Sequence, residues 1–166
     1  EAFESIEIGK ADFAVVPIEN SIEGSINETY DSLLQTKMHV SGEIYQRIRH
    51  CLITNKHTIS TIESVYSHPQ ALAQCRRYLK KKRLEPIPTY DTAGAVKMIK
   101  ERKIMNAAAI ASKRAAEIYK MEILDEGIED KKNNFTRFLV LSETKAEPTN
   151  NDRTSIIFSI EHIPGA

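Results

Sequence analysis

The sequence lacks the features that mark several large classes of protein. Its formal net charge is zero over 166 residues, so no overall field draws its surface toward nucleic acid or an anionic membrane. No apolar run approaches the length of a membrane-spanning helix. The one basic run, at residues 80–83, ends a predicted helix, where cations interact favourably with the helix dipole. We therefore expect neither a nucleic-acid partner nor a membrane partner.

Motifs for metal, redox and nucleotide chemistry are missing as well. Cys51 and Cys75 form no C-x-x-C pair, which fits two buried apolar side chains in a reducing cytosol. The six glycines are scattered and form neither G-x-G-x-x-G nor a P-loop. His57 and His68 lack metal-ligand spacing, and no G-x-S-x-G supports a hydrolase. We expect a cytoplasmic protein without a metal site.

Both ends of the chain look like cuts in a longer protein. The sequence begins at Glu1 inside a predicted helix that ends near Gly9. It stops just after Pro164-Gly165, a turn that should lead onward. We therefore expect a fragment, large enough for one good core or two small lobes.

Predicted strands and helices alternate along the chain, which indicates an α/β fold. Residues 12–18, which are apolar from Phe13 onward, predict a buried parallel strand covered on both faces. The next helix is predicted from the capping-box spacing of Ser25 and Glu28 and from an apolar stripe that includes Leu34. Further strands are predicted at 38–54, 65–66, 84–90, 107–111 and 135–142, and further helices at 71–82, 91–103 and 112–119, with a charged loop at 124–134.

Polar side chains gather where predicted strands begin or end, which is where open α/β sheets bind ligands. These groups are Glu19-Asn20-Ser21, Ser67 to Gln74, Ser112, and Asn133 to Arg137. Each has a simpler explanation. Ser67, His68 and Ser112 are candidate helix caps, Gln74 fits a solvated helix face, and residues 133–138 fit an edge strand after a polar loop. The case for a site depends on their joint placement.

Four of these segments, in order, resemble the motifs of prephenate dehydratases. They are Val16 to Ser21 with Gly24, Ser67 to Cys75, Ala109 to Ser112 with Ala115-Ala116, and Asn134 to Phe138. The tail, Thr154 to Ser159 followed by Pro164-Gly165-Ala166, is similar to the first strand and turn of the ACT regulatory domain of that family. The family opens with a strand ending in Gly-Pro-x-Gly-Thr-(Phe/Tyr)-Ser, and this chain begins after it.

The resemblance implies a two-lobed fold like that of type II periplasmic binding proteins. The active-site cleft would lie between the lobes, and the N-terminal strand would be missing. The first lobe would hold about 1–50 and 127–145 and the second about 51–126, followed by a linker at 146–152 and the start of a truncated ACT domain at 153–166. A homodimer or tetramer is implied, with phenylalanine as an effector acting through the ACT domain.

The implied activity is that of a carbon–oxygen lyase. Prephenate would lose CO2 and water to give phenylpyruvate in L-phenylalanine biosynthesis, without a metal or organic cofactor. Thr136 is the first candidate to donate a hydrogen bond or proton to the leaving hydroxyl. Glu19 would orient it, or supply the proton if buried. The implied substrate-binding residues are Asn20, Ser21, Ser67, Gln74, Ser112, Arg137 and Phe138.

Strand geometry and substrate choice leave questions open. Side chains alternate along a strand, so Thr136 and Phe138 share one face and Arg137 points to the other. Arg137 therefore reaches substrate only from a bulge or a strand end. Two alternative functions also stay open. One is an arogenate dehydratase, whose substrate carries an amino group on its side chain, and the other is a non-catalytic small-molecule binding protein of the same fold.

Overall fold

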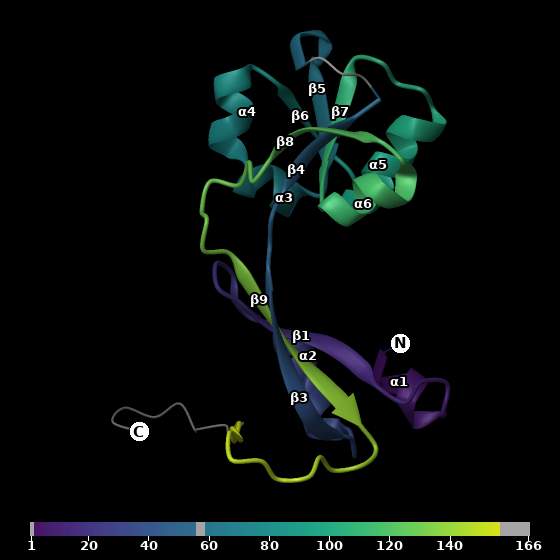
Figure 1. Cartoon of the computed structure of the whole chain (residues 1–166), viewed down its shortest axis with the longest axis vertical. Coiled ribbons are helices and arrows are strands. Elements are labelled where there is room, and N and C mark those ends of the chain that lie inside the picture. The colour runs from purple at the N-terminus through teal and green to yellow at the C-terminus, as the bar shows by residue number, and fades with distance from the viewer. Residues whose placement is uncertain (1, 56–58, 157–166) are drawn as a thin grey trace. The chain divides into compact units, whose positions relative to one another are not determined.

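The computed structural model describes residues 2–55 and 59–156, and its elements are labelled in Figure 1. The chain divides into two compact units. Unit 1 contains Glu1–Gln46 and Phe135–Ala166, and unit 2 contains Arg47–Asn134. Each unit has its own sheet and its own helices, so the predicted two-lobed α/β class is confirmed. Unit 1 is therefore assembled from two segments that are far apart in the sequence.

Unit 1 is a four-stranded sheet with two helices. Its elements are α1 (Ala2–Glu7), β1 (Ala14–Asn20), β2 (Gly24–Ser25), α2 (Asn27–Gln35), β3 (His39–Arg47) and β9 (Phe135–Ser142). The strand order is β2-β1-β9-β3, and β1 runs antiparallel to both of its neighbours. Ile6 of α1 packs in one core cluster with Ile18 and Leu141 of the sheet. Gly9 follows α1 with a positive φ of +67°, the conformation in which a glycine commonly ends a helix. The sequence predicts a helix end at this residue.

Two predictions for this unit are wrong. β1 is not a parallel strand covered on both faces, because its burial alternates: Val16 is 4% exposed and Val15 is 51% exposed. An antiparallel sheet needs no crossover helix on each face, so one face can stay open. Ser25 does not cap α2, since it pairs with Glu19 in the β1–β2 ladder. The cap residue is Ile26, without a side-chain hydrogen bond, and Leu34 is 66% exposed.

Unit 2 is a five-stranded mixed sheet with helices on both faces. The strand order is β6-β5-β7-β4-β8, with β5 parallel to β6 and β7, and β4 antiparallel to β7 and β8. The elements are β4 (Cys51–Thr54), η1 (Ile59–Thr61), β5 (Ser64–Ser67), α3 (Pro69–Gln74), α4 (Arg76–Lys82), β6 (Glu85–Pro88), α5 (Thr92–Glu101), β7 (Ala107–Ala111), α6 (Lys113–Tyr119) and β8 (Glu122–Glu126). The prediction that 84–90 forms an edge strand is confirmed by β6.

The central strand β7 belongs to two separate hydrophobic clusters. Ala108 and Ile110 pack with residues of α3 and α4, whereas Ala107, Ala109 and Ala111 pack with α5 and α6. In Figure 1, α4 accordingly lies on the other side of the sheet from α5 and α6. All five residues of β7 are buried because the helices cover both faces. The small alanine side chains of β7 let those helices approach closely. The bounds of this strand, 107–111, are those predicted from the sequence.

Three further predictions need correction. The helix predicted at 71–82 is broken at Cys75 into α3 and α4. Asp130 stabilises the break, because its backbone N–H donates to the carbonyl of Gln74 and its carboxylate accepts from the N–H of Arg77. The loop predicted at 124–134 begins inside β8, which pairs with β4. The strand at 135–142 is interior, between β1 and β3, so the edge-strand alternative is wrong.

No helix within the described ranges is long and apolar enough to cross a membrane. Of the predicted ACT segment, residues 153–156 are described and form neither helix nor strand, and residues 157–166 lie outside the described residues. His57 also lies outside them.

Candidate active site

Strands β1 and β9 bring Asn20 and Thr136 together in unit 1. The two residues are partners in the strand register, beyond a bulge between Pro17 and Glu19. Asn20 Nδ2 donates a hydrogen bond to Thr136 Oγ1 over 3.0 Å, and both residues are only 9% exposed. The hydroxyl predicted to act in catalysis is therefore held by an amide from a segment 116 residues away.

The direction of this hydrogen bond is fixed by the turn after β1. Asn20 Oδ1 accepts from the backbone N–H groups of Ile22 and Glu23 over 2.9 and 3.2 Å. The carbonyl end of the amide is thereby assigned, and its NH2 end points to Thr136. Since Thr136 Oγ1 accepts in this contact, its own hydroxyl hydrogen is not used there. The pair therefore presents Thr136 as a donor to a further group.

Ser21 and Glu19 flank Asn20 and have different surroundings. Ser21 exchanges two hydrogen bonds with the backbone of Phe135, one through its N–H and one through its hydroxyl oxygen, each 2.9 Å long. It thus fastens the start of β9 to the end of β1. Glu19 is exposed and, by strand alternation, faces away from the Asn20–Thr136 contact. The burial required for Glu19 to supply a proton is not found in this structure.

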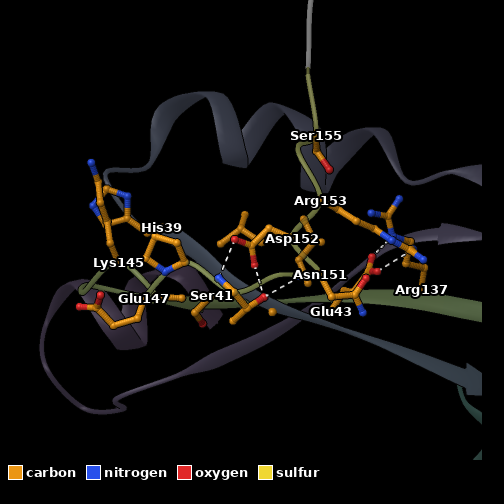
Figure 2. A pocket seen from close by; sticks show the side chains of 16 residues that line it. His39, Ser41, Glu43, Arg137, Lys145, Glu147, Asn151, Asp152, Arg153 and Ser155 are labelled. Carbon is orange, nitrogen blue, oxygen red and sulfur yellow. Dashed lines mark hydrogen bonds and ion pairs between the residues drawn. The ribbon is translucent and has the colours of Figure 1, made fainter.

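Arg137 has neighbours that differ from those of Thr136. Its Nε donates to Glu43 Oε2 over 2.8 Å, and its guanidinium carbon lies 5.9 Å from the centre of the Tyr45 ring. Glu43 Oε1 accepts from Arg153 Nη1, also over 2.8 Å, so one carboxylate joins two arginines. Figure 2 shows Glu43 between them, at the edge of a pocket of about 580 Å³.

This pocket is formed by β3, β9 and residues 145–155. Of the predicted site residues, it contains Arg137 alone. It is therefore a feature separate from the Asn20–Thr136 pair. Phe138, the third candidate residue on β9, is partly buried and pairs in register with Pro17.

In unit 2, two of the predicted site serines form hydrogen bonds to backbone groups of the fold. Ser67 is fully buried at the end of β5, and its hydroxyl donates to the carbonyl of Ile110 over 2.6 Å. The cap of α3 is His68, whose Nδ1 accepts from the N–H of Gln70 over 3.3 Å. Ser112 caps α6, as the sequence predicts, by accepting from the N–H of Ala115 over 3.3 Å.

Gln74 lies in a buried polar network that the sequence analysis did not foresee. Its Oε1 is 2.7 Å from His50 Nε2 and accepts from Asn134 Nδ2 over 3.1 Å. His50 is 8% exposed, and Asn134 is fully buried. A polar residue directly before the apolar run 51–53 was the available signal for His50. The structure thus brings three polar side chains together from three separate segments.

Metal ligands do not cluster within the described ranges. No group of three or more His, Cys, Asp or Glu side chains there is arranged to hold an ion. Both cysteines are buried free thiols. Burial, together with the negative charges of Glu129 and Asp130, raises the pKa of Cys75 far above its ordinary value.

A sequence model of the prephenate dehydratase family matches residues 1–146. Arogenate dehydratase/prephenate dehydratase 2, a chloroplastic protein of Arabidopsis thaliana, is 46% identical over 167 residues, which are 99% of this chain and 44% of the relative. The bifunctional chorismate mutase/prephenate dehydratase of Pseudomonas aeruginosa is 41% identical over 169 residues, which are 100% of this chain and 46% of the relative.

Solved structures agree in fold. The prephenate dehydratase of Arthrobacter aurescens in complex with L-Phe has a TM-score of 0.78 and 29% identity, over 89% of this chain and 50% of that chain. A quorum-quenching acylase named GqqA has a TM-score of 0.76 and 31% identity, over 92% of this chain and 55% of that chain.

The matches cover nearly all of this chain but only part of each curated relative. The chain spans less than half the length of the two curated relatives. In the other direction, the family match extends over nearly all of the described chain. By this match the chain belongs to the prephenate dehydratase family.

Proposed function

We propose that the protein to which this chain belongs converts prephenate to phenylpyruvate, as a carbon–oxygen lyase of L-phenylalanine biosynthesis. The observation that supports this most directly is the buried Asn20–Thr136 hydrogen bond, which leaves the Thr136 hydroxyl as a donor. The relatives named above carry the same activity in their names. The substrate is a dianion that must be oriented while its ring hydroxyl departs.

The reaction needs a hydrogen-bond donor at the oxygen of the departing ring hydroxyl. When the ring carboxylate leaves as CO2, its bonding electrons enter the ring and expel the hydroxyl, and the ring becomes aromatic. Hydroxide is a poor leaving group, so a hydrogen bond to the departing oxygen lowers the barrier. The departing hydroxide takes up one proton to become water. Thr136 is the proposed donor, and a proton from solvent restores its hydroxyl. A threonine hydroxyl is a weak acid, so it contributes only when held in place, as the amide of Asn20 holds it.

No metal or organic cofactor enters this proposal, because aromatisation itself drives the loss of CO2 and water. The other predicted residues keep their proposed roles. The family resemblance gives Glu19 the role of assisting Thr136, although its side chain is exposed and faces away from that residue in this structure. The proposed substrate-binding residues are Asn20, Ser21, Ser67, Gln74, Ser112, Arg137 and Phe138.

Two alternative activities have support from named relatives. Arogenate dehydratase is the first, since the Arabidopsis relative carries both names. Acyl hydrolysis is the second, because one similar structure is named an acylase. The Asn20–Thr136 pair favours the dehydratase, because acyl transfer requires a nucleophile activated by a neighbouring base and an amide NH2 is not a base.

Regulation and assembly form a further part of the proposal. We propose that phenylalanine acts as an effector through an ACT domain that begins near residue 153, and that the full-length protein is a homodimer or tetramer. The similar Arthrobacter structure, which contains L-Phe, supports the effector. The two buried free thiols support a cytoplasmic location.

Turnover of the full-length protein tests the proposed function. Purified protein is incubated in parallel with prephenate, arogenate and an acyl-homoserine lactone, and product formation is followed by chromatography. The proposal predicts phenylpyruvate from prephenate with the highest kcat/KM of the three substrates. A higher kcat/KM for arogenate would reassign the substrate. Acyl release without phenylpyruvate would overturn the proposal.

A further inference from the structure

Two side chains of β3, Glu43 and Tyr45, each contact the same pair of arginines in unit 1. Glu43 accepts from Arg137 Nε through one carboxylate oxygen and from Arg153 Nη1 through the other, both over 2.8 Å. The Tyr45 ring centre lies 5.9 Å from the guanidinium carbon of Arg137, and its hydroxyl oxygen accepts from Arg153 Nη1 over 3.4 Å. Glu43 and Tyr45 are two residues apart on one strand, so they share a face. That face joins Arg137 of β9 to Arg153.

Arg153 is the tether of the segment at residues 145–155. Within the described residues, every hydrogen bond or ion pair that joins this segment to the strands of unit 1 comes from Arg153. The other hydrogen bonds of the segment are internal to residues 149–152, where both carboxylate oxygens of Asp152 accept from Thr149. The segment, β3 and β9 also enclose the pocket of about 580 Å³. Part of the segment is therefore not packed against the strands, and its attachment depends on Arg153.

The two ion pairs of Glu43 differ in their exposure to water. The side chain of Arg137 is 22% exposed, whereas that of Arg153 is 67% exposed. Water and salt weaken an exposed ion pair, so the contact with Arg153 can break while the contact with Arg137 persists. Once Arg153 leaves, both oxygens of Glu43 are open to the Arg137 guanidinium, which can then pair through two nitrogens. The geometry of Arg137 therefore depends on whether Arg153 is bound.

Arg137 is the direct neighbour of the proposed catalytic threonine on β9. In the register with β1, Arg137 pairs with Glu19 and Thr136 pairs with Asn20. The Thr136 hydroxyl is held by the Asn20 amide over 3.0 Å. Hydrogen bonds weaken steeply as their angle worsens, so a small displacement of β9 at Arg137 changes how firmly Thr136 is held.

We propose that Arg153, Glu43 and Arg137 form a link through which effector binding to the proposed ACT domain changes the setting of Thr136. Arg153 and Glu43 act as positioning residues, since neither has a substrate contact in the proposed reaction. The effector half rests on the proposed function, in which phenylalanine acts through a domain that begins near residue 153. The structural half, in which Arg153 controls the environment of Arg137, depends on unit 1 alone.

Nitrogen-15 NMR of the arginine Nε–H groups in the full-length protein tests the structural half. Arg137→Lys assigns the Arg137 signal, because lysine has no such group. We expect Arg153→Gln to shift the Arg137 Nε–H signal, since Glu43 loses its second partner. An Arg137 signal that stays in place in Arg153→Gln would overturn the proposal.

Lys145→Gln is the matched control for Arg153→Gln. Both changes remove one exposed cation from the lining of the same pocket. Lys145 forms no ion pair with a described residue, and in Figure 2 it lies at the opposite end of the pocket from Arg137. The Arg137 signal should therefore be the same in Lys145→Gln as in the parent. An equal shift in both variants would show a general effect of charge and would also overturn the proposal.

Inhibition by phenylalanine tests the effector half in the full-length protein. Calorimetry gives the Kd of phenylalanine, and prephenate turnover is measured with and without saturating phenylalanine. We expect Arg153→Gln to retain the Kd and the uninhibited kcat within about twofold. Its inhibition should be about threefold to fivefold weaker, the range that one exposed ion pair can contribute. Lys145→Gln should be inhibited like the parent. Parent-like inhibition of Arg153→Gln would overturn the proposed link.

Arg153→Lys distinguishes the ion pair from a merely structural role of Arg153. A lysine can still pair with Glu43, so inhibition should recover in part. Equal loss of inhibition in the Gln and Lys variants would contradict a link through the ion pair. A parent protein that phenylalanine does not inhibit overturns the effector half, and one that does not turn over prephenate overturns the proposed function. The NMR result decides the structural half in both cases.

Discussion

The side-chain amide of Asn20 donates a hydrogen bond to the hydroxyl of Thr136, across two strands that are neighbours in the sheet and distant in the sequence. Its other end is occupied by two backbone N–H groups. The polarity of this contact decides whether Thr136 can act as a donor. Replacing the amide with a group of the same shape and opposite polarity tests that directly.

Asn20→Asp should reverse the contact. One Asp oxygen can still accept from Ile22 and Glu23, but the other replaces the NH2 and takes the hydroxyl hydrogen of Thr136. We expect kcat for prephenate to fall about 100-fold or more, because a preorganised donor to the departing oxygen is lost. Steady-state kinetics measure this, with thermal unfolding as the control for folding. An unchanged kcat would show that the direction of the bond is irrelevant.

Glu43→Gln should weaken unit 1. Arg137 and Glu43 are 22% and 24% exposed at the side chain, so their ion pair is partly shielded from water. We expect the free energy of unfolding to fall by about 1 kcal/mol. Arg153→Gln is the matched control: Arg153 is 67% exposed, and its loss should cost well under about 1 kcal/mol. Urea titrations compare the two, and equal losses would contradict the burial argument.

Truncation of two isoleucines on neighbouring helices should change the free energy of unfolding by very different amounts. Ile99 of α5 is fully buried in the cluster around β7, whereas Ile118 of α6 is 58% exposed. Ile99→Ala should reduce the free energy of unfolding by about 2–5 kcal/mol, because it leaves a cavity. Ile118→Ala should change it by less than about 0.5 kcal/mol. Chemical denaturation of both variants checks the assigned core.

Alkaline pH should destabilise the fold through Cys75. Burial raises the pKa of this thiol in the folded state, so the folded protein keeps it protonated where the unfolded chain releases its proton. The contribution is intact below the unfolded pKa of about 8.5 and is lost as the pH rises above it. Between pH 8 and 10 we expect a loss of at most about 2 kcal/mol.

Cys75→Ala isolates this contribution from other groups that titrate in the same range. The variant should lose less stability than the parent between pH 8 and 10, although it is less stable at neutral pH because of the cavity it leaves. Urea unfolding at both pH values measures the difference. Parallel curves for the two proteins would show that the buried thiol has no part in the alkaline loss.

Locally encoded features of the fold were predicted well from the sequence. The cap Ser112 and the strand at 107–111 depend on residues within one turn or one strand, and the structure confirms both. Features that depend on distant partners were missed. The break at Cys75 is stabilised by Asp130, more than 50 residues away, which no pattern within 71–82 shows.

In the candidate site, too, the features that depend on distant partners were missed. Asn20, Thr136 and Gln74 were selected from their motifs, but their hydrogen-bond partners come from other segments. His50 was not selected, since its link to Gln74 depends on the pairing of chain segments in unit 2. The exposed face of β1 was missed for a related reason: the apolar run 13–18 does not encode whether the neighbouring strands run parallel or antiparallel.

The most direct test of the central claim is the kcat of Thr136→Ala in the full-length protein, measured with prephenate. We expect kcat to fall by about 100-fold or more while KM changes much less, because the hydroxyl acts mainly in the transition state. Thr136→Ser keeps the hydroxyl and should retain most of the activity. Near-normal turnover by the Ala variant would contradict the role of Thr136 and the account built on it.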